Sequence, residues 1–396
     1  MFALFRWCNI GPHLALGQAA LCLCWVGIAQ GGGPEDPAVT WSETTWSPHA
    51  RDGRSPIEPP LAAVCPRADG ALLSVAADIA GRERTAPDAE TLAWSLRAAG
   101  SPYVWPRALV LSARQIDPAA AASRLGAWLG TEPGRGQRRC GIAMAHRRDG
   151  TEVLTAVAVD AEADMDPLPV RTRVGGWITV NARALVPATG AKLVVLGPSG
   201  PPRSVPTSFA HGRVIARANL DREGAWVVQL LLSTGIGPHP VLEANVFAGV
   251  DPPATPLALP APGESEAPVT DNPAGRLFEM MNGARASEGL AWLRWDRELH
   301  RAAEKHARRM LDARRLGHDV GDGDPAQRVE SSGIPAREVG ENVAHAENPS
   351  MAHRAIWASP SHRANLLERR FGRAGVGVAT DTDGSVWVAC LFASDR

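Results

Sequence analysis

The stretch Gly340–Leu367, GENVAHAENPSMAHRAIWASPSHRANLL, holds more polar and aromatic residues than apolar packing needs. Glu341 stands between a glycine and an asparagine, and His362 follows a Ser-Pro-Ser sequence. Between them, Pro349–Trp357 predicts a helix, which Pro360 should stop because proline cannot continue one. The stretch therefore predicts a helix that leads into a loop, with His362 presented by that loop.

Two amphipathic helices and a hairpin flank this stretch. Arg276–Asp319 predicts the two helices, and the second aligns six residues on one face at helical spacing. Gly372–Ala393 predicts the hairpin, because two alternating runs are joined by a turn that contains Asp383 and Gly384. Helices on a short sheet predict a layered α/β sandwich. The aligned face of the second helix comprises Leu299, Ala302, Ala303, His306, Ala307 and Met310.

Six motifs follow one another in order: MMNGARASEGLAWLRWDRELHRAAEKHA, Gly-His, GENVA, Trp-Ala-Ser-Pro-Ser-His-Arg-Ala-Asn, GVGVA and VWVACLFA. Together, over residues 272–392, they resemble the CAP superfamily (cysteine-rich secretory, antigen 5 and pathogenesis-related 1 proteins) in its compact bacterial form, the SCP-like domain. The resemblance implies an α-β-α sandwich with a surface cavity lined by two histidines and acidic residues. By motif position, His318 and His362 match the two histidines, and Glu341 matches the first cavity glutamate. The second glutamate of the family normally follows the helix tryptophan, where this chain has Ser359.

The same residue types suit a metal site on chemical grounds. Neutral imidazoles from separate segments, with a carboxylate that orients one ring or completes the shell, suit a zinc-like divalent ion with open positions. We therefore expect His318, His362 and Glu341 to bind a divalent metal ion. General acid and base roles are a second use for these groups, and local packing of the histidines is the alternative to both. Residues expected to line or support the cavity are Asn342, Trp357, Ser359 and Asn365.

The remaining histidines and the absent motifs bear on catalysis. The sequence contains no HExxH, GxSxG, Walker lysine loop or paired CxxC, so zinc proteases, serine hydrolases and nucleotide enzymes lack support. We favour a binding module that takes a divalent ion and an envelope lipid or glycan. The alternative is a metal-assisted hydrolase in which Glu341 or a histidine activates water, and a purely structural role is the third. The histidines expected on helix surfaces or in packing are His300, His306, His353 and His345, of which His345 is the spare candidate for the site.

Composition and the first residues predict where the protein functions. A formal net charge of −1 gives no reason to expect nucleic acid or an anionic membrane as a partner. Residues 1–30 carry Arg6 and then an apolar run, which predicts a secretory signal peptide removed near Ala29; an uncleaved anchor is the alternative. No later run is long enough to span a membrane. We therefore expect an extracytoplasmic product, secreted or periplasmic.

Cysteine usage predicts one disulfide. After removal of the signal peptide, the chain keeps Cys65, Cys140 and Cys390, and three thiols in an exported chain permit at most one internal bridge. We expect the bridge to join Cys65 and Cys140, because these two flank one segment.

Composition also divides the mature chain. The predicted parts are a flexible leader (31–60), a helix-and-hairpin domain (61–165), a small antiparallel β-sandwich without catalytic residues (166–250), a proline-rich linker (251–272) and the CAP-like domain (273–396).

The helix-and-hairpin domain looks like a degenerate copy of the C-terminal one. CGIAMAHRRDGTEVLTAVAVD from Cys140 parallels AGVGVATDTDGSVWVACLFA from Ala374, with the Asp-Gly turns in register. Ala108 stands in the place of Glu341, and no histidine follows Trp128 closely, so we expect the copy to lack the cavity. Chance similarity of two small units is the alternative. Further matched pairs are Asp69 with Asp296, Leu72 with Leu299, Gly100 with Gly333, and Trp128 with Trp357.

Overall fold

The computed structural model describes residues 39–45, 59–82, 87–130, 135–235, 237–255, 259–268 and 270–395. These residues belong to one compact unit, Ala38–Arg396. The predicted signal peptide, residues 1–30, lies outside the described residues. Within the described ranges, no helix is long and apolar enough to cross a membrane. The fold mixes helices and sheets, as the sequence predicted.

The C-terminal third folds around one sheet with the strand order β15-β17-β18-β16. Strands β16 and β17 both pair antiparallel with β18, whereas the short β15 is parallel to β17. The elements are α5 (Pro273–Ser287), β15 (Arg294–Trp295), α6 (Arg297–Ala313), α7 (Pro325–Ser331), β16 (Val339–Ala346), α8 (Pro349–Ala358), α9 (Pro360–Leu366), β17 (Phe371–Thr380) and β18 (Val386–Ser394).

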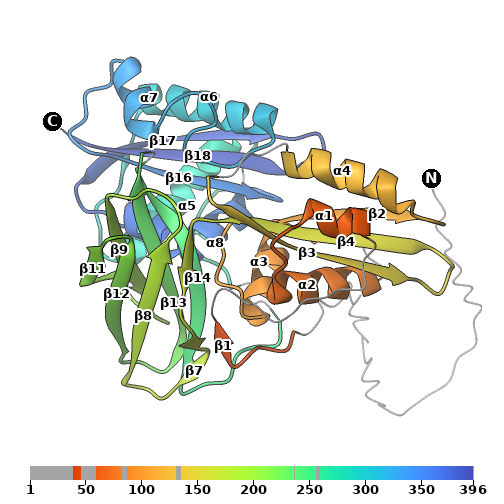
Figure 1. Ribbon diagram of the computed structural model, residues 1–396. Coiled ribbons are helices and arrows are strands. Elements are labelled where there is room, and N and C mark those ends of the chain that lie inside the picture. The colour runs from red at the N-terminus through yellow and green to blue at the C-terminus, as the bar shows by residue number, and fades with distance from the viewer. Residues whose placement is uncertain are drawn as a thin grey trace, which may run out of the picture. The chain divides into compact units, whose positions relative to one another are not determined.

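Helices cover both faces of this sheet, and Figure 1 shows α6 and α5 on opposite sides of it. The central strand β18 is buried along its whole length for this reason. Its side chains alternate between two hydrophobic clusters: Val388 and Phe392 pack with α5 and α8, whereas Ala389 and Leu391 pack with α6. The C-terminal third therefore has three layers, with the sheet between α5 and α8 on one face and α6 on the other.

Helix α6 lies unusually close to the sheet. Its N-cap is Asp296, whose side chain accepts hydrogen bonds from the backbone N–H groups of Glu298 and Leu299. The six residues predicted to share one face of this helix are all buried. On the sheet side, a Cβ atom added at Gly375 would lie 2.0 Å from the backbone nitrogen of His300, so only glycine permits this approach.

The N-terminal sheet has the order β2-β4-β3. Its elements are α1 (Pro59–Val64), α2 (Gly70–Gly81), α3 (Ala89–Ala98), β2 (Arg107–Ala113), α4 (Pro118–Gly130), β3 (Gln137–His146) and β4 (Glu152–Ala161). From α2 onward, the order along the chain is helix, helix, strand, helix and two strands of a hairpin, with the first strand paired to the last. Strands β16, β17 and β18 are connected and paired in the same way.

The two sheets also agree residue by residue. Ala108 lies opposite Val157, and Glu341 lies opposite Leu391 at the matching position. Asp69 caps α2 as Asp296 caps α6. A Cβ atom added at Gly141 would lie 2.0 Å from the backbone nitrogen of Leu73, which repeats the contact of Gly375 with α6. Shared register, caps and glycine contacts are what an internal repeat would produce.

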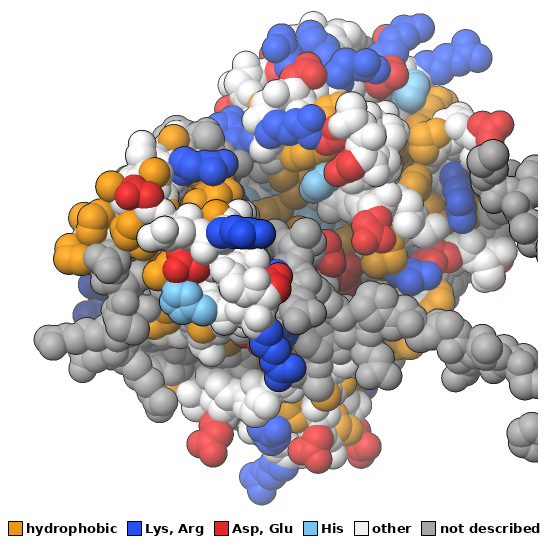
Figure 2. All heavy atoms as spheres, turned by 90° about the vertical axis from the view of Figure 1, so that its right-hand side faces the viewer, with side chains coloured by type: hydrophobic (Ala, Val, Ile, Leu, Met, Phe, Trp, Pro, Cys, Tyr) orange, Lys and Arg blue, Asp and Glu red, His pale blue; other side chains and the backbone are white. Residues whose placement is uncertain are grey.

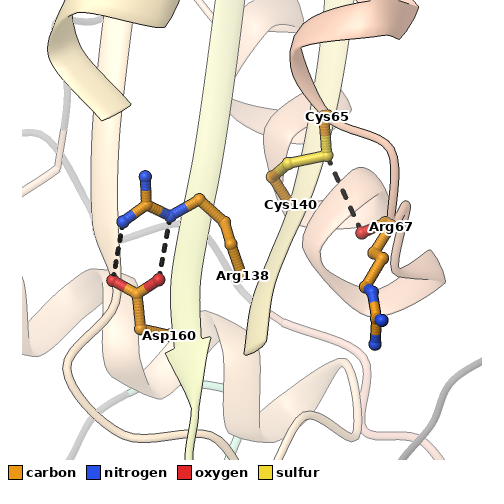
Figure 3. The surroundings of a disulfide bond; sticks show 5 residues. All are labelled: Cys65, Arg67, Arg138, Cys140 and Asp160. Atoms are coloured by element: carbon orange, nitrogen blue, oxygen red, sulfur yellow. Dashed lines mark hydrogen bonds and ion pairs between the residues drawn. A yellow bond between two sulfur atoms is a disulfide. The ribbon is translucent and has the colours of Figure 1, made fainter. Parts of the chain in front are cut away.

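Cys65 and Cys140 form the predicted disulfide, with Cα atoms 6.1 Å apart (Figure 3). The bridge ties the end of α1 to β3, and both cysteines are buried. Next to it, Arg138 and Asp160 of the adjacent strands form a bidentate ion pair with distances of 2.8 and 3.0 Å. Among the described residues, Cys390 is a free, buried thiol.

Residues 163–248 form two sheets that share one hydrophobic cluster. One sheet has the order β10-β9-β13-β14-β7 and the other β11-β12-β8-β5. The strands are β5 (Ala163–Met165), β6 (Leu168–Pro169), β7 (Arg171–Thr172), β8 (Gly176–Ala184), β9 (Gly190–Leu196), β10 (Arg203–Val205), β11 (Thr207–Ala210), β12 (Arg213–Leu220), β13 (Gly224–Thr234) and β14 (Gly237–Ala248). Alternate residues of β8 and β12 are buried, as one-sided packing requires.

Part of the predicted flexible leader is ordered against the domain. The short strand β1 (Thr44–Thr45) pairs with β6. Trp41 is buried between the rings of Trp94 and Phe247, and its indole N–H donates to the carbonyl of Pro253. Residues 39–45 therefore belong to the core, because the burial of a tryptophan outweighs the turn-forming composition around it.

Part of the predicted linker is packed too. Residues 261–267 form turns, and Ala261 and Ala267 are buried. The carboxylate of Glu264 makes a bidentate ion pair with Arg354 of α8, and the ring of His353 hydrogen-bonds the carbonyl of Pro262. The proline-rich composition predicted a semi-extended linker. Residues 261–267 instead pack on α8 of the C-terminal third.

Candidate functional site

The predicted site residues come from three elements of the C-terminal third. Glu341 lies on β16, His318 follows α6, and His362 lies in the first turn of α9. The expectation of a loop at His362 was wrong: Pro360 ends α8 but also begins α9, because proline is tolerated in the first turn of a helix. Figure 2 shows histidine side chains beside hydrophobic ones on one face of the molecule.

Glu341 has a partner on each carboxylate oxygen. Oε2 accepts a hydrogen bond from Nδ1 of His318 at 2.9 Å, and Oε1 accepts one from the guanidinium of Arg328. Burial alone would raise the pKa of Glu341, but the His318 hydrogen bond and the Arg328 charge hold this pKa below its usual value. The carboxylate is therefore a buried anion that accepts from His318 through one oxygen and from Arg328 through the other.

This hydrogen bond sets the tautomer of His318. A carboxylate only accepts, so Nδ1 must carry the proton and Nε2 of a neutral ring is left with its lone pair. The side chain of His318 is 17% exposed, so this nitrogen lies close to solvent. The arrangement is the one by which a carboxylate orients a metal-binding histidine in proteins.

His362 has the opposite surroundings. Its Nε2 atom is buried and has no hydrogen-bond partner among the described residues, although the residue as a whole is half-buried. Burial, and to a smaller extent the charge of neighbouring His318, lowers the pKa of His362 to about 3. The ring is therefore neutral at physiological pH, with an unsatisfied nitrogen beside the second imidazole.

Two asparagines join β16 to α9. Nδ2 of Asn342 donates to the carbonyl of His362 at 2.9 Å. Nδ2 of Asn365 donates to the carbonyl of Glu341 at 3.1 Å and to Oδ1 of Asn342 at 3.0 Å. These bonds fix the distance between the strand that carries Glu341 and the helix that carries His362. Asn342 and Asn365 thus lie where a supporting role requires them.

Trp357 and Ser359 lie at the junction between α8 and α9. The guanidinium of Arg363 lies over the ring of Trp357, 3.9 Å from its centroid. Ser359 is the N-cap of α9, but its side chain makes no capping hydrogen bond. The cap comes instead from Gln229 on β13, whose Oε1 accepts from the backbone N–H of Ser361 at 3.0 Å. A strand far away in sequence therefore helps to position the helix of His362.

Sequence reasoning missed three charged or polar members of the buried cluster. His306 is fully buried: Nδ1 lies 2.9 Å from Oδ2 of Asp322, and Nε2 lies 3.0 Å from the carbonyl of Gly317. Both ring nitrogens face acceptors, so neither is available to a metal ion. Arg328 pairs with Glu341 and donates to the carbonyl of His318 at 2.7 Å. The buried position of His306 on α6 was the only signal in the sequence.

His345, the spare candidate, does not join the cluster. Its ring stacks on Trp387 with centroids 4.2 Å apart, and its Nε2 lies 3.2 Å from Oγ of Ser385. Residues 341 and 345 lie on the same strand, but a strand separates such residues by about 13 Å. His300 contacts the carbonyl of Val376, as expected of a packing residue.

Within the described ranges, no group of three or more histidine, cysteine, aspartate or glutamate side chains is arranged to hold a metal ion. Of the described histidines in the cluster, His318 and His362 each keep an Nε2 atom without a hydrogen bond, whereas both nitrogens of His306 are paired; Oδ1 of Asp322 also lacks a hydrogen bond. Two imidazoles can bind a divalent ion whose other positions are filled by water or substrate.

Comparison with known proteins agrees with this fold. Residues 278–392 match the family model described as CAP, the cysteine-rich secretory protein family. Comparison with curated proteins gives no match.

Solved structures with similar parts include proteins of three bacteria. An outer surface protein of Borrelia burgdorferi is 22% identical, with 30% of this chain and 90% of that chain covered and a TM-score of 0.29. An extracellular protein of Bacillus anthracis that contains an SCP domain is 17% identical, with 57% and 87% covered and a TM-score of 0.29. A cysteine-rich secretory protein of Staphylococcus aureus is 13% identical, with 67% and 87% covered and a TM-score of 0.27.

These TM-scores are low, so the assignment depends on the family match and on the elements described above. The matched residues run from α5 to β18 and include the sheet, the helices on both of its faces, and all three predicted site residues. Residues 278–392 of this chain form a CAP domain.

Proposed function

We propose that the CAP domain binds a divalent metal ion of the zinc type through Nε2 of His318 and Nε2 of His362. The observation that supports this best is the buried Nε2 of His362, which has no hydrogen-bond partner among the described residues. A buried polar atom without a partner costs about 1–3 kcal/mol. A metal ion would remove this cost by accepting the lone pair of Nε2.

Glu341 acts through His318 in this proposal. Both of its oxygens are already bonded, and the side chain is only 1% exposed. The carboxylate therefore holds the Nδ1–H of His318 and keeps Nε2 directed away from itself. This replaces the sequence-based expectation of a three-residue ligand set by two ligands and one orienting group.

The protonation of His362 favours the same role. Only a neutral imidazole binds a metal, and a pKa of about 3 means that no proton competes at this ring near neutral pH. Two protein ligands leave several positions of the ion open, so we expect an exchangeable ion rather than a structural one.

We also propose that the protein is exported. The predicted signal peptide supports this, and two of the similar structures are named as an outer surface protein and an extracellular protein. The disulfide between Cys65 and Cys140 also favours export, because disulfides persist in oxidising compartments outside the cytoplasm.

The alternative is a metal-assisted hydrolase in which Glu341 or a histidine activates water. Oε2 of Glu341 accepts from His318 and Oε1 accepts from Arg328, so this carboxylate is already engaged as an acceptor. A general base needs to reach the proton that it removes. We therefore retain the binding module as the conclusion.

Calorimetric titration with zinc at pH 7.5 tests the proposal. The parent chain should bind one ion, and the variant His318→Ala/His362→Ala should bind none while its circular dichroism stays that of the parent. The matched control is His345→Ala, because His345 lies on the same strand as Glu341 but outside the cluster. Equal zinc affinity in the parent and the double variant would refute the proposal.

A further inference from the structure

The outer face of the sheet β11-β12-β8-β5 carries exposed side chains of an unusual kind. Strands β8, β11 and β12 contain three arginines and no aspartate or glutamate, although the whole chain has 42 acidic and 41 basic residues. The outward residues of β8 and β12 pair in register as Trp177 with Asn219, Thr179 with Arg217, Asn181 with Ile215, and Arg183 with Arg213. We call these eight residues the arginine–tryptophan face.

Two of its apolar side chains are exposed. Trp177 is 63% exposed and Ile215 is 53% exposed. A large apolar side chain that is exposed next to a second one and among polar neighbours offers a contact surface to a ligand. The guanidinium of Arg217 lies over the ring of Trp177, 5.3 Å from its centroid. This stacking holds the ring in place and leaves the rest of it free for a ligand.

The arginines make the face electropositive. Arg183 and Arg213 lie directly opposite each other on neighbouring strands, and like charges in that relation destabilise a sheet. Arg183 is 4.0 Å from Asp164, but that carboxylate already has a bidentate bond from Arg139. Arg213 has no ion pair among the described residues. An anion between the two guanidinium groups would remove the repulsion.

We propose that the arginine–tryptophan face binds an acidic polysaccharide. The eight residues extend over six residue steps, about 20 Å along the strands, which fits an extended oligomer better than a single small anion. Arginine forks match carboxylates, Trp177 offers a flat surface for the apolar side of a sugar ring, and Thr179 and Asn181 can bond to hydroxyl groups. A second copy of this chain would present the same arginines and be repelled.

This inference is independent of the metal site. The face belongs to residues 176–220, whereas His318 and His362 belong to the CAP domain. In this proposal the β-rich region, which lies in the sequence between the sheets β2-β4-β3 and β16-β18-β17, anchors the protein to an acidic polymer of the envelope or cell surface. Failure of one proposal leaves the other standing.

Binding of polygalacturonate to the full chain, measured by biolayer interferometry at physiological salt, tests the proposal. The matched probe is the fully methyl-esterified polymer, which has the same backbone without the charge. We expect binding of the acid form only. Trp177→Ala and Arg213→Gln/Arg217→Gln should each weaken it by about tenfold or more.

Two control variants separate this face from general charge effects. Trp292 is also 63% exposed, and Arg308 and Arg309 are exposed on α6. Trp292→Ala and Arg308→Gln/Arg309→Gln should leave the affinity within about twofold. The proposal is overturned if the parent does not bind polygalacturonate, if the controls lose as much affinity as the face variants, or if polyglutamate and single-stranded DNA bind as tightly as polygalacturonate.

Discussion

The N-terminal sheet β2-β4-β3 and the C-terminal sheet β16-β18-β17 have the same strand order and pairing, but the residues of the proposed metal site lie with the second sheet. Both have an aspartate N-cap on the helix that crosses the hairpin, and both have a glycine under that helix. At the position of Glu341 the N-terminal sheet has Ala108. The comparison shows that the contacts that define the fold and the residues that define the site are separable.

The two regions are also stabilised differently. The N-terminal sheet has a disulfide, Cys65–Cys140, whereas the cysteine of the C-terminal sheet, Cys390, is a free buried thiol. In place of the bridge, the C-terminal region has a buried network in which Glu341 is paired with Arg328 and His318. The disulfide packs with residues of α1 and α4, whereas the ionic network joins β16 to α7 and to the segment that follows α6.

The largest expected effect comes from the shared glycines. Gly141→Ala and Gly375→Ala would each place a Cβ atom 2.0 Å from the backbone of the crossing helix, so each should lower the free energy of unfolding by more than about 3 kcal/mol. Urea unfolding followed by tryptophan fluorescence measures this. The control is Gly126→Ala in α4, where no atom lies within 4 Å and alanine should stabilise the helix slightly. A tolerated Gly141→Ala beside a damaging Gly375→Ala would break the structural equivalence.

The disulfide should give the next largest effect. Cys65→Ala/Cys140→Ala should lower the free energy of unfolding by about 2–4 kcal/mol, because the bridge closes a long loop in the unfolded chain. Zinc affinity should not change, since the bridge joins α1 and β3, outside the CAP domain that contains the proposed metal site. A reducing agent should destabilise the parent and leave the double variant unaffected. Free alkylation of both thiols without reduction would show that the bridge does not form.

Glu341→Ala should weaken zinc binding less than the loss of the proposed ligands His318 and His362. Glu341→Ala removes the group that holds Nδ1 of His318, so the zinc dissociation constant should rise by about ten- to a hundredfold without complete loss of binding. Glu347→Ala, an exposed carboxylate just beyond the same strand, is the control. Complete loss with Glu341→Ala, at unchanged stability, would mean that the carboxylate is itself a ligand.

The smallest effect concerns His353. Burial lowers the pKa of His353, so the unfolded chain takes up a proton near pH 6.5 before the folded chain does. The stability from this residue is therefore present above pH 6.5 and is lost as the pH falls below it. His353→Gln keeps a donor for the carbonyl of Pro262 but does not titrate. Between pH 7.5 and 5.5 the parent should lose up to about 1.4 kcal/mol more than this variant, as measured by urea unfolding. Equal losses would show that His353 titrates normally.

Local patterns were enough to predict much of the CAP domain. The helical spacing in α6 identified all six of its buried positions, and the motif match assigned Glu341, His318 and His362 to one cavity, in which Glu341 bonds to His318. Both signals lie within short stretches of sequence. The Asp-Gly turn between two alternating runs identified the hairpin of β17 and β18 for the same reason.

The remaining features depend on contacts between distant segments. Arg328 and Glu341 pair only after α7 packs on β16, and Gln229 caps α9 from a different sheet. Nothing near Gln229 in the sequence indicates this partner. The burial of Trp41 was hidden in the same way by the proline- and glycine-rich composition around it.

The most direct test is an anomalous diffraction map of zinc-soaked crystals of the full chain at pH 7.5. The account predicts one strong peak about 2.0–2.1 Å from both Nε2 of His318 and Nε2 of His362, with Glu341 still bonded to Nδ1 of His318 and no peak beside Ala108. A peak bonded to Glu341 in place of one histidine, or the absence of zinc from both imidazoles, would contradict it.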